Sequence, residues 1–200
     1  MTGKTKVWTS EAWGRTNYLK FISYDDEPHS AEMCRKFKRG AQIDPDWFPR
    51  KVYLENLGVK PTEIFSIRGF LVLVSERFVE LLGNFDLGSN QLVETALYES
   101  ARQSKLPMRF FVFNIVEKKT DCFVPNESKG PFDNIGGDFF WTAPNGYDGI
   151  AVRESAVIDG VDVWMDPILG QTPFFSGPLG DAIKKGKFGR TGLKPCVVLS

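Results

Sequence analysis

Two serines stand where an apolar run meets a short helical pattern, Ser75 in VLVSERFVELLG and Ser176 in PFFSGPLGDAIKKG. A serine between a strand and a helix is the usual place of the nucleophile in α/β-hydrolases, but that turn needs glycine two residues to either side. Neither serine has this pattern, and the chain offers one histidine, His29, as a base. Both serines are therefore predicted to cap helix N-termini by accepting hydrogen bonds from free backbone N–H groups. No catalytic residue is assigned.

Metal and cofactor sites find little support in the residue types. The chain has one histidine and three scattered cysteines without a CxxC pair, which predicts neither a zinc site nor a disulfide framework and favours a reducing compartment. Carboxylates between residues 133 and 166 could hold magnesium or calcium, but DNIGGDFFWTA lacks the ligand alternation of an EF-hand. GGDFFW and GKFGRTG match neither the P-loop nor the dinucleotide fingerprint. We expect no cofactor and no metal.

Charge is divided unevenly along the chain. The whole sequence has 25 basic and 25 acidic residues, whereas residues 121–181 hold ten acidic residues and two basic ones. The remainder therefore carries a net charge of about +8, and a field divided in this way can steer a partner of opposite sign. The alternative left open is that the acidic residues only keep loops solvated.

Within this acidic stretch, FDNIGGDFFWTAPNGYD combines carboxylates with aromatic side chains. Aromatic anchors ringed by charge are typical of protein-binding hot spots, although alternate aromatic residues of a strand belong to the core by default. Both interpretations stay open. The candidate partner-binding residues are Asp133, Asp138, Phe140, Trp141, Tyr147, Asp148, Asp162 and Asp166.

The periodicity predicts a single α+β domain over residues 1–200, with a mixed or largely antiparallel sheet and a few short helices. Residues 1–60 read as an irregular N-terminal part and residues 61–200 as the main strand-helix part. Gly83 is expected to end the first capped helix in a left-handed conformation. Asp159-Gly160 is expected to form a hairpin turn between the strands AVI and VDVW.

Further elements are predicted from local patterns. The expected strands are KVWTS, YLKFISY, 63–67, 70–74, 92–98, 109–116, 139–142 and 195–199, with RFFVFNIV central in a sheet, and a further helix is expected over SAEMCRKFKRG with Gly40 after its end.

Three segments follow one another along the chain: VLVSERFVELLG, RFFVFNIVEKKTDCFVPNES and VIDGVDVWMDPILGQTPFFSGPLGDAIKKGKFGRTGLKPC. With these segments the chain resembles a family of bacterial immunity proteins found beside polymorphic toxins, which is related to an uncharacterised myxobacterial family. The resemblance covers about residues 70–198. It implies a short helix near residues 121–128 and a non-enzymatic inhibitor that binds a cognate toxin in the cytoplasm of the producing cell. A basic toxin domain such as a nuclease would suit the acidic stretch.

The same resemblance implies a protein partner, and the equal numbers of basic and acidic residues make no case for a membrane or for direct nucleic-acid binding. The first residues, MTGKTKVWTSEAWGR, lack the apolar region of a signal peptide, and FLVLV is far too short to span a bilayer, so a cytoplasmic location is expected. The competing hypothesis is an enzyme or small-ligand domain whose pocket is lined by the aromatic and carboxylate residues of 133–166.

Overall fold

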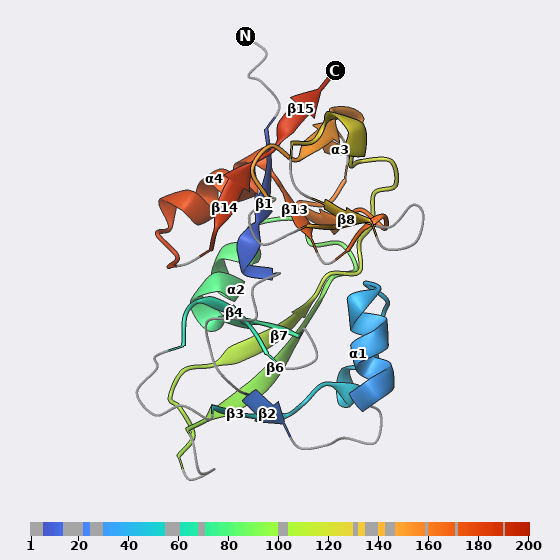
Figure 1. Ribbon diagram of the computed structural model, residues 1–200. Helices are drawn as coiled ribbons and strands as arrows, with labels where there is room; N and C mark the ends of the chain where they lie inside the picture. Colours follow the sequence, from blue (N-terminus) through green and yellow to red (C-terminus); the bar gives the residue numbers. More distant parts are fainter. Residues whose placement is uncertain are drawn as a thin grey trace.

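Four sheets and several short helices make up the part of the chain that the computed structural model describes. That part comprises residues 6–13, 22–24, 30–54, 61–67, 71–99, 104–129, 132–134, 140–142, 147–158, 160–170, 172–189 and 191–200. The strands pair mostly antiparallel, so the predicted α+β class is confirmed (Figure 1).

The largest sheet has six strands in the order β2-β3-β6-β7-β5-β4. Its members are β2 (Ile22–Tyr24), β3 (Lys51–Leu54), β4 (Ile64–Ser66), β5 (Val72–Ser75), β6 (Gln91–Tyr98) and β7 (Phe110–Asn114). Only β3 and β6 run parallel among these pairs. The apolar strand β7 lies in the interior of the sheet, as its sequence predicts.

The second sheet is antiparallel and has the order β11-β13-β1-β14. It consists of β1 (Val7–Ser10), β11 (Val163–Met165), β13 (Pro173–Ser176) and β14 (Leu193–Pro195). In Figure 1 the blue N-terminal strand β1 accordingly lies among red strands from the other end of the chain. The part predicted as irregular therefore supplies an interior strand of this sheet.

The remaining strands form two smaller sheets. β10 (Ala151–Arg153) pairs parallel with β15 (Val197–Leu199), and β9 (Phe140–Thr142) lies between β12 (Leu169–Gly170) and β8 (Phe132–Asn134). The strand expected over 195–199 is thus two strands. β14 ends at Pro195, the Cys196 amide still donates to Val7 O at 2.9 Å, and β15 then turns to the other sheet, where the Val197 amide donates to Ile150 O at 2.8 Å.

The α-helices are α1 (Ser30–Lys38), α2 (Glu76–Leu82), α3 (Ser155–Ile158) and α4 (Gly177–Lys185), and single 3₁₀ turns are η1 (Glu11–Trp13), η2 (Pro45–Trp47) and η5 (Pro125–Glu127). The hairpin predicted around Gly160 is wrong because α3 occupies the segment read as a strand; Asp159 lies outside the described residues. Gly83 ends α2 with φ −61°, in the right-handed region, whereas Gly40 follows α1 with φ +56° as expected.

The two sheets contain the same unit twice. In the first unit, the hairpin β4–β5 leads into α2, β6 follows, and β7 lies between β5 and β6. In the second unit, β11 and β13 lead into α4, β14 follows, and the place of β7 is taken by β1. The registers agree, because Ser75 pairs with Phe110 at the start of β7 and Ser176 pairs with Val7 at the start of β1.

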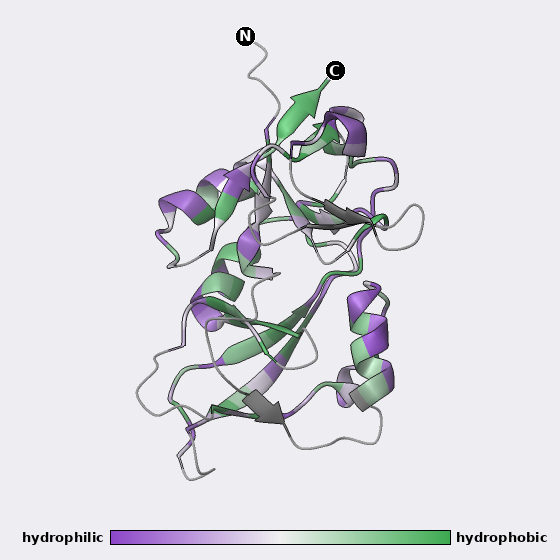
Figure 2. Ribbon diagram, viewed as in Figure 1, coloured by the Kyte–Doolittle hydropathy of each residue, from purple (hydrophilic) through white to green (hydrophobic). Residues whose placement is uncertain are grey.

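Aromatic packing between α2 and the segment that follows α4 joins the two units into one core. Phe78 of α2 meets Phe188 edge-on at 5.2 Å between ring centroids, and Arg77 lies over the same ring at 4.4 Å. A single apolar cluster runs from the large sheet into β1, β13 and α4, and a second cluster lies beneath α3. In Figure 2 the interior strand β7 is largely green, while the helices α1 and α4 carry both purple and green residues. None of the described helices is long and apolar enough to cross a membrane.

Candidate functional site

Ser75 caps α2 from a buried position. Ser75 is only 2% exposed, and its Oγ accepts a hydrogen bond from the Phe78 amide at 3.2 Å. The hydroxyl donates to the Glu63 carboxylate, and the Ser75 amide donates to Glu63 O at 2.9 Å. Both hydrogen-bonding functions of this hydroxyl are therefore used within the fold.

Ser176 caps α4 with the same set of contacts. Its Oγ accepts from the Leu179 amide at 3.3 Å and donates to the Asp162 carboxylate, while its own amide donates to Asp162 O at 3.0 Å. Pro178 lies in the first turn of α4, where its missing N–H group costs no helical hydrogen bond. The cap predicted for each serine is the role its side chain has.

Two of the predicted partner-binding residues are buried, Tyr147 at 3% and Asp166 at 2% exposed. Asp166 Oδ2 accepts from the Phe123 amide at 2.8 Å and Oδ1 accepts from the Ile168 amide at 3.0 Å. Burial raises the pKa of the Asp166 carboxyl, and these amide hydrogen bonds oppose the rise. A surface role for Tyr147 and Asp166 is thus corrected: both side chains lie inside the fold, and Asp166 fixes the loop before β12.

Asp162 and Asp148 differ in exposure. Asp162 is half-buried: it accepts from Ser176 Oγ as described, and its Oδ2 accepts from the Asp86 amide at 2.8 Å, so it ties the second unit to the loop after α2. Asp148 is exposed, with 72% of its side chain accessible, and pairs with Lys194 Nζ at 3.0 Å. Asp148 is therefore the one member of the predicted set with a described, exposed side chain.

The remaining predicted residues are only partly described. Asp133 lies in β8, and Phe140 and Trp141 lie in β9, by their backbones. Asp138 lies outside the described residues. Ion pairs cross the division of charge seen in the sequence, since Lys6 Nζ lies 3.1 Å from Asp181 Oδ2 and Lys194 binds Asp148.

The cysteines are reduced, and two of them lie in the smaller core. Burial raises the pKa of Cys122 to about 11 and also raises the pKa of Cys196 well above its usual range. Cys122 Sγ accepts from Trp164 Nε1 at 3.4 Å. Both thiols are thus weak nucleophiles near neutral pH. Among the described residues, no group of three or more His, Cys, Asp and Glu side chains could hold a metal ion.

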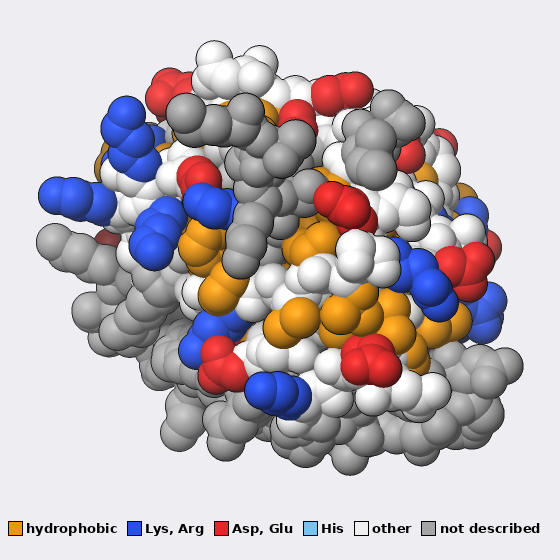
Figure 3. Space-filling view, turned by 90° about the horizontal axis from the view of Figure 1, so that it is seen from above, with side chains coloured by type: hydrophobic (Ala, Val, Ile, Leu, Met, Phe, Trp, Pro, Cys, Tyr) orange, Lys and Arg blue, Asp and Glu red, His pale blue; other side chains and the backbone are white. Residues whose placement is uncertain are grey.

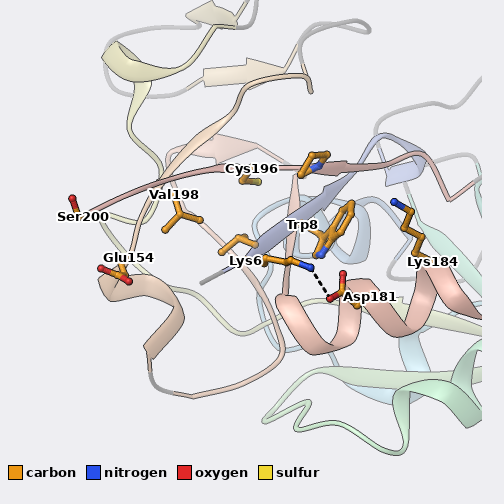
Figure 4. Close-up of a pocket in the computed structure, with 10 residues that line it drawn as sticks. Lys6, Trp8, Glu154, Asp181, Lys184, Cys196, Val198 and Ser200 are labelled. Atoms are coloured by element: carbon orange, nitrogen blue, oxygen red, sulfur yellow. Dashed lines mark hydrogen bonds and ion pairs between the residues drawn. The ribbon is translucent and has the colours of Figure 1, made fainter. Parts of the chain in front are cut away.

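A groove runs beside α4, and we call it the α4 groove. It consists of two adjoining hollows of about 660 and 340 Å³ that share Trp8, Lys184 and Pro195. The larger hollow extends toward Cys196, Val198 and Glu154, and the smaller one extends toward Phe188, Thr191 and Leu193. Figure 4 shows the larger hollow, with Lys6 and Asp181 joined across one side and Trp8 between them and Lys184.

Trp8 reaches this position because α4 has a glycine where it crosses β1. A Cβ atom at Gly180 would lie 2.0 Å from Trp8 Cδ1, well inside contact distance. The indole Nε1 is buried and has no hydrogen-bond partner among the described residues. Of the described residues lining the groove, only Glu154 belongs to 133–166, so the groove differs from the pocket that the sequence suggested.

Sequence reasoning missed this groove because long-range contacts form it: the pairing of β1 with β14 places Trp8 opposite Pro195, and the packing of α4 on β1 brings Lys184 to the Trp8 ring. The one available signal was Gly180 inside a helical pattern, because an interior glycine often marks a close approach. In comparisons with known proteins, the chain matches no family model and no curated protein.

Proposed function

We propose that this chain is a non-enzymatic immunity protein that binds a cognate bacterial toxin in the cytoplasm of the producing cell and neutralises it. The resemblance of residues 70–198 suggested this function, and the α4 groove is the observation that supports it best. The groove lies open at one end of the molecule and combines an apolar floor with a charged rim. That combination is typical of a protein-binding surface.

The side chains that could do chemistry support the same proposal. The hydroxyls of Ser75 and Ser176 serve as caps, and the thiols of Cys122 and Cys196 have raised pKa values. The groups where the two hollows meet are the apolar Trp8 and Pro195 and the cation Lys184. These groups can bind a partner but form no nucleophile–base pair.

The first test is whether a toxin gene lies beside this gene, since its absence would count against the proposal; the second is co-expression of this chain with the toxin domain of such a gene. We expect cells that produce the toxin domain to survive only when this chain is present, and the two purified proteins to form a complex in isothermal titration calorimetry. Survival without complex formation, or no protection at all, would contradict direct neutralisation.

The acidic stretch contributes to the same proposal through Asp148. Reversing its charge with Asp148→Lys should weaken toxin binding about tenfold if the toxin presents a basic face, because a like charge then opposes the partner. The matched control is Glu99→Lys, the same change at an exposed residue after β6 in the other unit. If reversals at both Asp138 and Asp148 leave binding and protection unchanged, the acidic stretch is not part of the interface.

The larger hollow also favours a second candidate, a small-ligand-binding domain. Its volume of about 660 Å³ lies within the range of small-molecule sites, about 300–1,000 Å³. A panel of metabolites tested by thermal shift would detect such a ligand as a rise in the unfolding temperature. A rise that disappears in Trp8→Phe would favour this candidate over the immunity protein.

A further inference from the structure

We propose that the open edge of β15, at the larger hollow of the α4 groove, receives an extended segment of the partner protein. The segment would pair antiparallel with this edge and place one apolar side chain beside Val198. This inference rests on the proposed function and names the way in which the partner is held. It follows from the repeated unit, because the corresponding edge of the first unit is covered by an extended segment of this chain.

The repeat extends as far as β15. β10 pairs parallel with β15, just as β3 pairs parallel with the end of β6. The same number of residues separates Leu97 of β6 from Ser75 and Val198 of β15 from Ser176. Val198 in the second unit therefore corresponds to Leu97 in the first.

In the first unit an extended segment covers this edge. The Leu106 amide donates to Leu97 O at 2.8 Å. The Glu99 amide donates to Ser104 O, also at 2.8 Å, so residues 104–106 pair antiparallel with the end of β6. Residues directly opposite each other in such a pair have their side chains on the same face. Leu106 accordingly lies beside the buried Leu97 and packs against the large core.

The edge of β15 has no such neighbour in the part of the chain that is described, where this strand pairs with β10 alone. The Val197 amide donates to the residue before β10, and the Leu199 carbonyl accepts from the residue after it, each at 2.8 Å. Successive residues direct their backbone groups to opposite sides of a strand, so those of Val198 and Ser200 point away from β10. Both residues line the larger hollow (Figure 4).

β15 also lacks the features that usually protect an edge strand. Its sequence, VVL, has neither a charge nor a proline, whereas the neighbouring edge strand β14 ends at Pro195. Val197 is 44% exposed, and β15 is green along its length in Figure 2. Figure 3 shows apolar side chains between charged ones at this end of the molecule. An open, apolar edge of this kind is the surface to which an extended peptide adds as a further strand.

The hollow can take an apolar side chain beside Val198. A residue opposite Val198 would direct its side chain to the same face of the strand. Val7 and Cys196 line the hollow together with Val198, and all three belong to the smaller core or pack against it. With a volume of about 660 Å³, the hollow has room for a side chain in the place that Leu106 takes in the first unit.

The sequence indicates that this side chain comes from another protein. Leu106 stands three residues before Arg109, which directly precedes β7. Lys6 directly precedes β1 in the same way, and the residue three positions before it is Gly3. Glycine has no side chain that could fill the hollow, so the apolar residue is the partner's.

The first arm of the test measures Kd by calorimetry with the toxin domain of a toxin gene beside this gene. Ser200→Pro removes the N–H group at the open edge and leaves the hydrogen bonds to β10 in place. We expect this change to raise Kd about tenfold, as for the loss of one buried hydrogen bond. The matched control Ser200→Ala removes only the hydroxyl and should change Kd less than about twofold.

The second arm probes the edge without the toxin. The ¹⁵N-labelled chain is titrated to millimolar concentration with N-acetyl-Ser-Lys-Leu-Pro-amide, which has the sequence of residues 104–107. We expect the amide resonances of Val198 and Ser200 to shift. The shifts should be lost when the leucine amide of the peptide is N-methylated, because that amide is the donor to Val198 O. They should weaken when the leucine is replaced with alanine.

The two arms separate this inference from the proposed function. If the wild-type chain does not bind the toxin domain, the proposed function is overturned, and the peptide arm alone decides whether the edge accepts a strand. If Ser200→Pro binds the toxin domain as tightly as the wild type, the proposed function stands and the partner docks elsewhere. Absence of shifts, or equal shifts with the N-methylated peptide, would overturn pairing at this edge.

Hydrogen exchange in the free chain tests two other occupants of the edge. We expect the Ser200 amide to exchange rapidly. Protection that disappears when residues 1–5 are deleted would mean that the chain covers this edge itself. A dimer in analytical ultracentrifugation that Ser200→Pro dissociates would mean that β15 pairs with a second copy. Either result would overturn the assignment of the edge to a partner.

Discussion

Replacing Gly180 with alanine should destabilise the protein, although alanine is the better helix former. A Cβ atom at position 180 would lie 2.0 Å from Trp8 Cδ1 and 2.3 Å from Trp8 Cγ. Ordinary carbon contacts are about 3.5–4.0 Å, so either the indole must rotate or α4 must move away from β1 by more than about 1 Å. Trp8 is part of the apolar cluster shared by both units, and its displacement would loosen that packing.

Two opposing effects set the magnitude. A Gly→Ala change inside a helix stabilises by up to about 1 kcal/mol. Overpacking of a well-filled core costs about 1–3 kcal/mol and sometimes more, and an overlap this deep with a buried ring belongs at the upper end. We therefore expect Gly180→Ala to lower the free energy of unfolding by about 2 kcal/mol. For a chain of this length that corresponds to a fall in Tm of about 4–8 °C.

Urea unfolding followed by circular dichroism measures this effect against two control glycines. A Cβ atom at Gly189 would meet nothing within 4 Å, and at Gly83, where φ is −61°, it would meet the nearest atom at 3.6 Å. Alanine at either control position should be neutral or stabilise by about 0.4–1 kcal/mol. The close contact with Trp8 thus predicts opposite signs for the same substitution.

A double-mutant cycle identifies the cause. In a Trp8→Ala background the two closest atoms, Cδ1 and Cγ, are gone and only the Cβ atom at 2.8 Å remains, so Gly180→Ala should cost much less than in the wild type. Two results would refute the reasoning: Gly180→Ala as stable as the wild type, or a cost that persists undiminished in the Trp8→Ala background. Either would mean that the approach of α4 to Trp8 does not require glycine.

Three further predictions concern buried polar groups. In urea titrations, Ser75→Ala should lower the free energy of unfolding by about 2 kcal/mol, because the Phe78 amide and the Glu63 carboxylate both lose a partner. The control Ser89→Ala, at an exposed loop position, should change the free energy of unfolding by less than about 0.5 kcal/mol. The raised pKa of the Asp166 carboxyl means that the folded state holds this proton more tightly than the unfolded chain, so the contribution of Asp166 to stability falls as the pH rises above about 4. The loss of stability caused by Asp166→Asn should therefore be larger at pH 4 than at pH 7. An equal loss at both pH values would contradict this prediction. Thiol titration with a disulfide reagent at pH 8 should label Cys122, buried and with its pKa raised to about 11, only when the protein unfolds, and fast labelling of the native protein would contradict this burial.

The sequence predicted features that depend on near neighbours. A helix cap involves residues three positions apart, so Ser75 and Ser176 could be assigned from local order alone. The same holds for the apolar strand β7 and for Gly40, whose left-handed conformation follows α1. Short apolar runs were less certain: SAVI reads equally well as a strand or one turn of helix, and the structure makes it α3.

Features set by distant segments could not be predicted in this way. β1 pairs with β13 across more than 160 residues, and nothing within KVWTS indicates that partner. The burial of Tyr147 and Asp166 likewise follows from the smaller core beneath α3, while their local sequence, rich in turn residues and carboxylates, is typical of a surface loop. The groove depends on the same long-range pairing, because Trp8 comes from β1 and Lys184 from α4.

The repeated unit helps to separate residues that build the fold from residues that distinguish one end of the molecule. A cap required by the architecture should occur wherever the unit occurs, and a serine with a carboxylate before the hairpin is found in both, as Ser75 with Glu63 and as Ser176 with Asp162. A catalytic serine would have no reason to recur with the same contacts. The capping contacts therefore belong to the fold, and a specific function should depend on positions where the two units differ.

The clearest difference lies where the helix crosses the interior strand. By register, Phe111 of β7 corresponds to Trp8 of β1, since Val74 pairs with Phe111 and Phe175 pairs with Trp8. Four residues after the capping serine, the first unit has Val79 and the second has Gly180. In the second unit the larger ring of Trp8 lies against glycine, where a Cβ atom would come within 2.0 Å of it. Trp8 also lines the α4 groove, so it is at this crossing, and not at the capping serines, that we expect substitutions to change partner binding.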